Sequence, residues 1–135
     1  MKLPPPNTKP IEDVTRSAGL GTECGRFLRA QIGNEAVFLL LKTGSRVDVG
    51  TWFFKRRVWV CLLGKELVLF ASGKRPYIER VPFERLHSSR YNHVTGEVML
   101  APIEDLRVAR LKTPPLEGLQ LLAHIFRGED EHGLA

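Results

Sequence analysis

Histidine, serine and tyrosine side chains, which can act in catalysis or bind metal ions, gather in residues 87–93. The stretch reads His-Ser-Ser-Arg-Tyr-Asn-His. A metal site needs several ligands that converge at a fixed geometry, and no cysteine or acidic pair stands at ligand spacing here. The sequence also contains no Gly-x-Ser-x-Gly nucleophile motif, phosphate loop or dinucleotide fingerprint. We therefore predict that the protein is not an enzyme and that it uses neither a metal nor a cofactor.

Basic residues form the second chemically informative group. The net charge of the chain is +5, but residues 42–90 hold eleven Lys and Arg against four acidic residues, a local charge of +7. A basic middle of this kind could attract the phosphates of lipid head groups or nucleic acid, or an acidic partner. It could equally consist of charged strand ends, which keep a sheet soluble and discourage edge pairing.

Aromatic residues stand beside some of these cations. Trp52, Phe53, Phe54 and Trp59 bracket the basic run at 55–57. Exposed aromatics next to cations are the combination with which small barrels bind single-stranded nucleic acid. Aromatic residues within strands are more often part of a core, so nucleic-acid binding is the second alternative and not the main prediction.

Turn signals divide the middle of the chain into segments rich in β-branched and aromatic residues, which favour strands. We predict seven strands, at 35–42, 46–54, 58–63, 66–71, 77–83, 97–101 and 106–111. Gly64-Lys65 suits a two-residue hairpin turn, and residues 84–96 form the longest irregular stretch of this region. The predicted organisation is a flexible or weakly structured N-terminal extension (1–33), one domain (34–127) and a frayed acidic tail (128–135).

A C-terminal helix is predicted after the strands. Thr113 can cap it, and Pro114 stands at the first helical position. One apolar stripe recurs at helical spacing and consists of Leu116, Leu119, Leu122, Ala123 and Phe126. His124 falls outside this stripe, so we expect it to be solvated.

The number and order of these elements resemble the pleckstrin-homology (PH) superfold, and most closely the bacterial PH-like domains. The likeness rests on the cadence of "VWVCLLGKELVLFASG", "IERVPFERLHSS" and "GEVMLAP", and it covers residues 35–127. It implies a mainly β fold, in which two nearly orthogonal antiparallel sheets form a seven-stranded, partly open barrel and a C-terminal helix plugs one end. Other small barrels, such as the OB-fold, are the alternative, although they do not usually end in such a helix.

The same resemblance implies a ligand site. PH domains that hold phosphoinositides carry basic residues at the first hairpin loop and on the strands beside it. Carried over to this chain, the anionic head-group site would consist of Lys42, Arg46, Lys55, Arg57 and Lys65. Simple alternation of strand direction places the denser clusters, 55–57 and 74–75, at the opposite end from the first loop. A shifted hairpin register would bring Lys55 and Arg57 to that loop.

Three predicted strands, 35–42, 58–63 and 66–71, are apolar on both faces, whereas a barrel strand needs only one apolar face. An uncovered outer face would be an apolar patch of the kind that marks an interface. We therefore expect a cover, formed either by residues 11–33 of the same chain or by another subunit. The interface candidates are Phe38, Leu40, Trp59, Cys61, Leu63, Val68 and Phe70.

Nothing in the sequence indicates export or a membrane span. No apolar run approaches the roughly 18 to 20 residues that a span needs, and the first ten residues lack the apolar region of a secretory signal. The two cysteines, at 24 and 61, do not form a disulfide framework. A reducing, cytoplasmic location is the resulting prediction.

These observations predict a non-catalytic binding or assembly module that acts through a homo-oligomer or another protein. The first alternative is the binding of phospholipid or phosphoinositide head groups at an anionic lipid surface through the basic loops. The second alternative is single-stranded nucleic acid. Salt separates these functions, because phosphate-directed binding weakens steeply as salt rises and apolar self-association does not.

Overall fold

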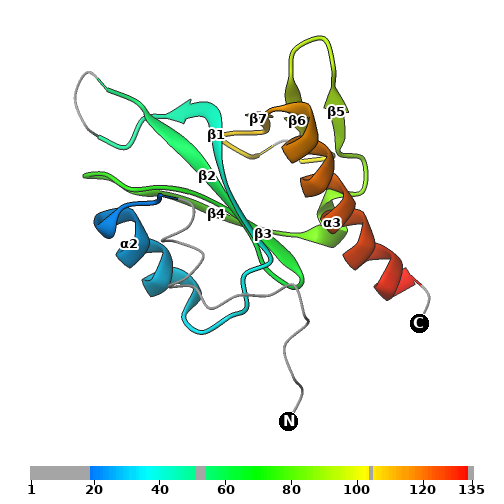
Figure 1. Ribbon diagram of the computed structural model, residues 1–135, viewed down its shortest axis with the longest axis horizontal. Helices are drawn as coiled ribbons and strands as arrows, with labels where there is room; N and C mark the ends of the chain where they lie inside the picture. Colours follow the sequence, from blue (N-terminus) through cyan, green and yellow to red (C-terminus); the bar gives the residue numbers. More distant parts are fainter. Residues whose placement is uncertain (1–18, 51–53, 104, 134–135) are drawn as a thin grey trace.

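The computed structural model describes residues 19–50, 54–103 and 105–133 (Figure 1). In these residues the fold is mainly β, as predicted, with seven strands in two antiparallel sheets and a C-terminal helix. One sheet has the strand order β1-β2-β3-β4 and the other β5-β6-β7. No helix of the described residues is long and apolar enough to cross a membrane.

The elements occur along the chain in a simple order. They are α2 (Thr22–Ile32), β1 (Leu39–Val47), β2 (Arg56–Leu62), β3 (Glu66–Ala71), β4 (Tyr77–Pro82), the 3₁₀ helix η1 (Phe83–Leu86), β5 (Arg90–Asn92), β6 (Glu97–Met99), β7 (Arg110–Lys112) and α3 (Pro115–Gly133).

The number of strands agrees with the prediction, but three of the strands differ. One is β7, which spans only Arg110–Lys112 where 106–111 was predicted. The predicted turn at 43–45 is part of β1, which continues to Val47 with a register shift against β2 between Lys42 and Arg46. The predicted strand 46–54 was therefore wrong over its described part, because only 46–47 are extended there; residues 51–53 lie outside the described residues. The stretch predicted to be irregular contains β5, whose three polar residues carry no apolar strand pattern.

The register shift in β1 lies where the first sheet meets the second. The Ser45 hydroxyl donates to the Arg110 carbonyl at 2.7 Å and accepts from the Lys112 amide N–H at 2.9 Å, both on β7. A Cβ on Gly44 would lie 3.3 Å from the side chain of Lys112, so the glycine permits this close approach. Side-chain hydrogen bonds thus join the two sheets along β1.

Both faces of the four-stranded sheet are buried, by different partners. One face packs against the second sheet and α3 in a cluster that includes Val58, Val60, Leu67, Leu69, Leu111, Leu121 and Ile125. The other face packs against α2 in a cluster that includes Cys24, Leu28, Ile32, Trp59, Cys61, Val68 and Phe70. Figure 1 shows α2 and α3 on the two sides of this sheet.

The helix α2 is the cover that the sequence left undecided between the chain itself and a second subunit. Six of the seven interface candidates are buried (Leu40, Trp59, Cys61, Leu63, Val68 and Phe70), and Phe38 is half-buried. These side chains are therefore not an outer surface in this structure. Residues 20–32 of the predicted extension pack in the same buried cluster as the sheet. Residues 1–18 of that extension lie outside the described residues.

A guanidinium group fastens the C-terminal end of α2 to the sheet. Arg80 on β4 donates from Nη1 to the Gln31 carbonyl at 2.9 Å and forms ion pairs with Glu35, at 3.1 Å, and with Glu66. The carbonyl groups at a helix C-terminus carry partial negative charge, so a cation there stabilises the helix. The helix ends at Gly33, whose φ of +62° suits glycine.

The helix α3 differs from its prediction at its start and in the face that it buries. It begins at Pro115, and the buried Thr113 hydroxyl has no hydrogen-bond partner in the described structure, so it does not cap the helix. Leu116 and Leu119 are 70% and 49% exposed, and the buried face consists of Gly118, Leu121, Leu122 and Ile125. Most residues from 116 to 126 are apolar, so helical spacing fits two faces and only packing decides between them.

The prediction that His124 is solvated was also wrong. Its side chain is half-buried, with Nε2 3.2 Å from the Leu63 carbonyl oxygen. Its ring centroid lies 4.6 Å from that of Phe38 and 5.5 Å from that of Phe83. The imidazole therefore helps to join α3 to the sheet.

Candidate anion-binding site

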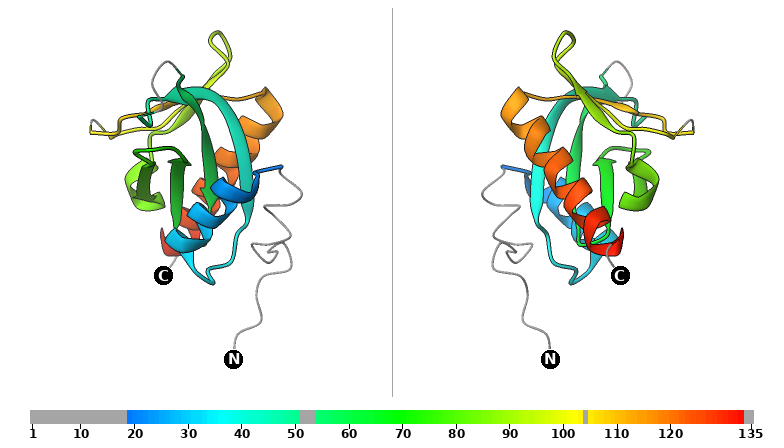
Figure 2. Two further views of the ribbon diagram at one scale, coloured as in Figure 1. Left: turned by 90° about the vertical axis from the view of Figure 1, so that its left-hand side faces the viewer. Right: turned by 90° about the vertical axis from the view of Figure 1, so that its right-hand side faces the viewer.

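Three connections between strands meet at one end of the four-stranded sheet, which the left-hand view of Figure 2 faces. They are the β1–β2 connection (48–55, with 51–53 outside the described residues), the β3–β4 connection (72–76) and the β6–β7 connection (100–109, with 104 outside the described residues). The Arg75 amide N–H donates to the Val49 carbonyl at 2.6 Å, and Arg107 Nη2 donates to the Asp48 carbonyl at 2.9 Å. The first connection is thus bonded to both of the others.

Two glycines allow the first two connections to pack this closely. A Cβ on Gly73 would lie 2.3 Å from Val49 Cγ2, and a Cβ on Gly50 would lie 3.1 Å from Arg75 Cγ. Gly50 also has a φ of +79°, which side chains other than glycine rarely adopt. Larger residues at these positions would push the two connections, and the cations that they carry, apart.

Six cations lie on or beside these two connections. Lys55 is the last residue of the first, Arg56 and Arg57 follow it, Lys74 and Arg75 belong to the second, and all five are exposed. The sixth, Arg46, is also exposed and pairs directly across the β1–β2 ladder with Arg57. None of the six forms an ion pair with a residue that the structure describes. We call these six residues the basic end.

The pairing of Arg46 with Arg57 is unfavourable for folding. Like charges directly opposite each other across two antiparallel strands destabilise the pair. No described carboxylate forms an ion pair with either arginine. A bound anion would relieve this repulsion, which makes this end of the sheet a candidate binding site.

The acidic residues nearby are engaged in structural bonds. Glu79 Oε1 accepts from the Tyr77 hydroxyl at 2.7 Å and from the Arg107 amide N–H at 3.0 Å, and Asp48 Oδ1 accepts from the Gly50 amide N–H at 2.9 Å. Burial, followed by the bond to Glu79, raises the pKa of Tyr77, so its hydroxyl remains protonated and keeps donating. These bonds hold the connections in place around the basic end.

A large apolar side chain accompanies the cations. Phe54 stands immediately before the run at 55–57 and is 75% exposed. The surface thus combines an exposed aromatic ring with positive charge from two connections. This combination suits a ligand that offers phosphates beside an apolar region.

The structure brings together three of the five residues predicted for this site: Arg46, Lys55 and Arg57. Lys42 lies further back on β1, with Nζ 5.7 Å from the centroid of the Trp59 ring. Lys65 lies on the β2–β3 turn, at the other end of the seven-residue strand β2, which spans about 20 Å. Lys65 is therefore separated from the basic end by the length of the sheet.

Three cations of the basic end, Arg56, Lys74 and Arg75, were missing from the predicted set. They were assigned to the end opposite the first loop, because that loop was predicted at 43–45. The first connection is instead 48–55, which places both dense clusters beside it. The high density of Lys and Arg at 55–57 and 74–75 is the sequence signal that could have indicated these three residues.

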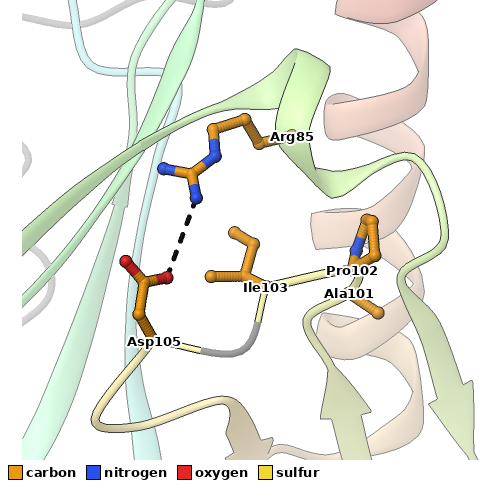
Figure 3. A pocket seen from close by; sticks show the side chains of 5 residues that line it. All are labelled: Arg85, Ala101, Pro102, Ile103 and Asp105. Carbon is orange, nitrogen blue, oxygen red and sulfur yellow. Dashed lines mark ion pairs between the residues drawn. The ribbon is translucent and has the colours of Figure 1, made fainter.

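A hollow of about 570 Å³ lies at the β6–β7 connection and is shown in Figure 3. Its lining consists of Arg85, Ala101, Pro102, Ile103 and Asp105. Arg85 Nη2 lies 3.7 Å from Asp105 Oδ1, so the cation in this hollow is already paired with a carboxylate. This hollow is therefore a weaker candidate for an anion-binding site than the basic end.

The histidines at 87 and 93 each contact a neighbour in the sequence. His87 Nδ1 lies 3.2 Å from Ser88 Oγ, and the His93 ring packs edge-on against Tyr91 with centroids 5.0 Å apart. Among the described residues, no group of three or more metal-ligating side chains converges.

Comparisons of the chain with protein-family models, with curated proteins and with solved structures give no match. The relation to the PH superfold therefore stays a prediction.

Proposed function

We propose that the protein is a non-catalytic module that binds phosphate-bearing lipid head groups at an anionic membrane surface through its basic end. The observation that carries this proposal is the set of six exposed cations that form no ion pair with a described residue. Each Lys or Arg near an anionic membrane contributes about 1 kcal/mol of attraction. Several acting together suffice for reversible binding.

The position of Phe54 favours a lipid over a free phosphate. Its ring is exposed and adjoins the cations in the sequence, so a membrane that meets the cations also meets the ring. Aromatic side chains beside basic residues are a common feature of segments that lie in the membrane interface. The ring adds apolar contact with the acyl region to the charge attraction.

Nucleic acid and protein assembly are less well supported by the same surface. Trp59, one of the aromatics predicted to stack on bases, is buried under α2, while Trp52 and Phe53 lie outside the described residues. Both faces of the four-stranded sheet are covered, which removes the sheet as a stacking platform. The covered face equally removes the interface on which the assembly prediction rested.

Vesicle co-sedimentation tests the proposal with a charge-matched control. The test variant is Lys74→Glu/Arg75→Glu, and the control is Lys65→Glu/Arg90→Glu, which changes the net charge equally at exposed sites on the β2–β3 turn and on β5, away from the basic end. We expect the test variant to bind phosphatidylserine and phosphoinositide vesicles more weakly by about thirtyfold or more. The vesicle affinity of the control should stay within about threefold of that of the unmodified protein. Added salt should weaken the binding of the unmodified protein to these vesicles.

Three outcomes would contradict the proposal. Equal losses in both variants would mean that only net charge matters. Equal binding to neutral phosphatidylcholine vesicles would exclude head-group recognition. A clear preference for single-stranded DNA over the anionic vesicles would mean that the basic end binds nucleic acid and not lipid. Circular dichroism of each variant checks that a loss of binding does not come from unfolding.

A further inference from the structure

The turn of the β5–β6 hairpin (93–96) presents an apolar side chain to solvent. Val94 is 94% exposed, the largest exposed fraction among the large apolar side chains that the structure describes. Asn92 orders this turn, because its Oδ1 accepts from the amide N–H groups of Val94, at 2.9 Å, and Thr95, at 3.3 Å. Gly96, with a φ of +72°, donates to the Asn92 carbonyl at 2.8 Å. Polar hydrogen bonds thus build the turn, and Val94 contributes almost no buried contact to it.

The hairpin projects from the same side of the molecule as the β1–β2 connection. Both rise at the top of Figure 1, and both stay at the top in the two views of Figure 2, which are turned about the vertical axis. Phe54, in the described part of that connection, is 75% exposed. Single exposed apolar residues are ordinary on a protein surface. Phe54 and Val94, however, belong to two segments that project in one direction, so one flat surface can meet both.

Exposed cations lie between the two projecting segments. The hydrogen bonds of Ser45 hold β7 beside the end of β1. On β7, Arg110 and Lys112 are exposed and Leu111 is fully buried, so the two cations point outward, because successive side chains of a strand face opposite sides. Neither cation forms an ion pair with a residue that the structure describes. Arg46 directly follows Ser45, so these cations continue the basic end towards the hairpin.

One acidic residue stands among these cations. Glu97 on β6 lies opposite Lys112 in the ladder, and it is the single acidic residue in the sequences of β5, β6 and β7. Arg46, Arg110 and Lys112 against Glu97 leave a local charge of +2. The surface between the two projecting segments therefore remains positive and attracts an anionic membrane.

The hairpin is held in a fixed position relative to these cations. Thr113, directly after β7, donates from its amide N–H to the Gly96 carbonyl at 3.1 Å. The Tyr91 hydroxyl on β5 donates to the Thr113 carbonyl at 2.9 Å. The turn is thus bonded to the chain that leaves β7, and a membrane that meets the cations of β7 also meets the turn.

We propose that the turn of the β5–β6 hairpin is a second point of membrane contact, at which Val94 enters the interface of an anionic bilayer. This proposal rests on the proposed function and adds an orientation to it. Phe54 and Val94 mark the two ends of the contact, and the cations of β1 and β7 lie against the head groups between them. A protein held at one point can tilt on the membrane, whereas two separated contacts restrict the tilt.

Site-specific fluorescence tests the contact directly. Val94→Cys is labelled with the fluorophore NBD, whose emission increases when it leaves water, and both native cysteines are buried. We expect the emission to rise about twofold or more when phosphatidylserine vesicles are added, because the label at this position enters the interface. The control is Lys65→Cys with the same label, on the exposed turn at the other end of β2. Its emission should stay unchanged.

A pair of charge-matched substitutions tests the contribution to affinity. Val94→Asp and Ala30→Asp each lower the net charge by one at an exposed position, and Ala30 is on α2, which lies away from the top of Figure 1. Val94→Asp should weaken binding to the vesicles by about fivefold or more, because it removes an apolar contact and adds a repelled charge. Ala30→Asp should stay within about twofold of the unmodified protein. Circular dichroism checks that both variants are folded.

The results that would overturn the proposal are distinct. Unchanged emission at position 94, while the unmodified protein sediments with the same vesicles, would exclude the hairpin contact and leave the basic end as the lipid site. Equal increases at positions 94 and 65 would mean adsorption without a preferred orientation. Equal affinities of Val94→Asp and Ala30→Asp would mean that Val94 adds nothing to binding. Failure of the unmodified protein to sediment would instead contradict the proposed function itself, so the two failures are distinguishable.

Discussion

The helices α2 and α3 lie on opposite sides of the same sheet, and they differ in how much of their apolar surface is buried. Cys24, Leu28 and Ile32 form one buried stripe on α2, and most of its other positions are polar, small or charged. The helix α3 buries one apolar stripe and leaves Leu116 and Leu119 exposed on another face. One helix is thus only a cover, whereas the other has more apolar surface than its own fold needs.

Among substitutions in the two helices, Leu28→Ala in α2 is expected to lower the stability of the protein most. Leu28 is fully buried against the sheet, so its truncation removes apolar contact and leaves a cavity. We expect the free energy of unfolding to fall by about 2 to 5 kcal/mol. Urea denaturation, followed by tryptophan fluorescence, measures this loss, because Trp59 lies under α2. A loss well below ~1 kcal/mol would mean that α2 adds little to the stability of the sheet.

A smaller loss is expected from Gly118→Ala, on the buried side of α3. A Cβ at this position would lie 2.6 Å from Tyr91 Cδ2 and 2.7 Å from Thr113 Oγ1. Overpacking of this kind costs about 1 to 3 kcal/mol, which outweighs or offsets the gain of about 1 kcal/mol that alanine brings to a helix interior. Thermal melts should show a lower Tm.

Gly64→Ala is the control for this change, because the nearest atom to its Cβ would be a Phe38 ring carbon at 3.9 Å. Its Tm should stay close to that of the unmodified protein. Equal melting of the two variants would show that the contact between α3 and β5 is looser than the structure indicates.

The smallest effect is expected from Leu116→Ser, on the exposed side of α3. Leu116 is 70% exposed in the single chain, so little apolar contact is lost. We expect the free energy of unfolding to change by less than about 0.5 kcal/mol when measured by urea denaturation. A loss above ~1 kcal/mol would show that this face of α3 is buried within the fold.

Strands β2, β3 and β4 of the first sheet were predictable because their signals are local. Strand β3 occupies residues 66–71 as predicted, since a run of apolar residues there is bounded by turn residues on both sides. The helix α2 was harder to predict, because the four glycines at 19, 21, 25 and 33 disfavour one long helix across this stretch. Three of these glycines lie outside α2, and only Gly25 lies within it. They mark where the helix begins and ends.

The candidate site was predictable in its chemistry but not in its place. The density of Lys and Arg can be counted in the sequence, whereas the location of the first loop depends on a contact across the fold. Thr-Gly-Ser at 43–45 has the composition of an ordinary turn. It stays extended because Ser45 bonds to β7, more than sixty positions further along the chain. No local sequence pattern indicates that residues 43–45 pair with a strand so far along the chain.

The two hydrogen bonds of Ser45 also bear on aggregation. An exposed strand edge with unpaired amide and carbonyl groups is a template on which another extended chain can add. The Ser45 hydroxyl occupies a carbonyl and an amide on the β7 edge that faces β1, at Arg110 and Lys112. A single hydroxyl thus closes this part of the seam between the sheets against a foreign strand. Removal of the Ser45 hydroxyl would leave these two backbone groups of β7 unpaired and open to a foreign strand, without changing the strand order of either sheet.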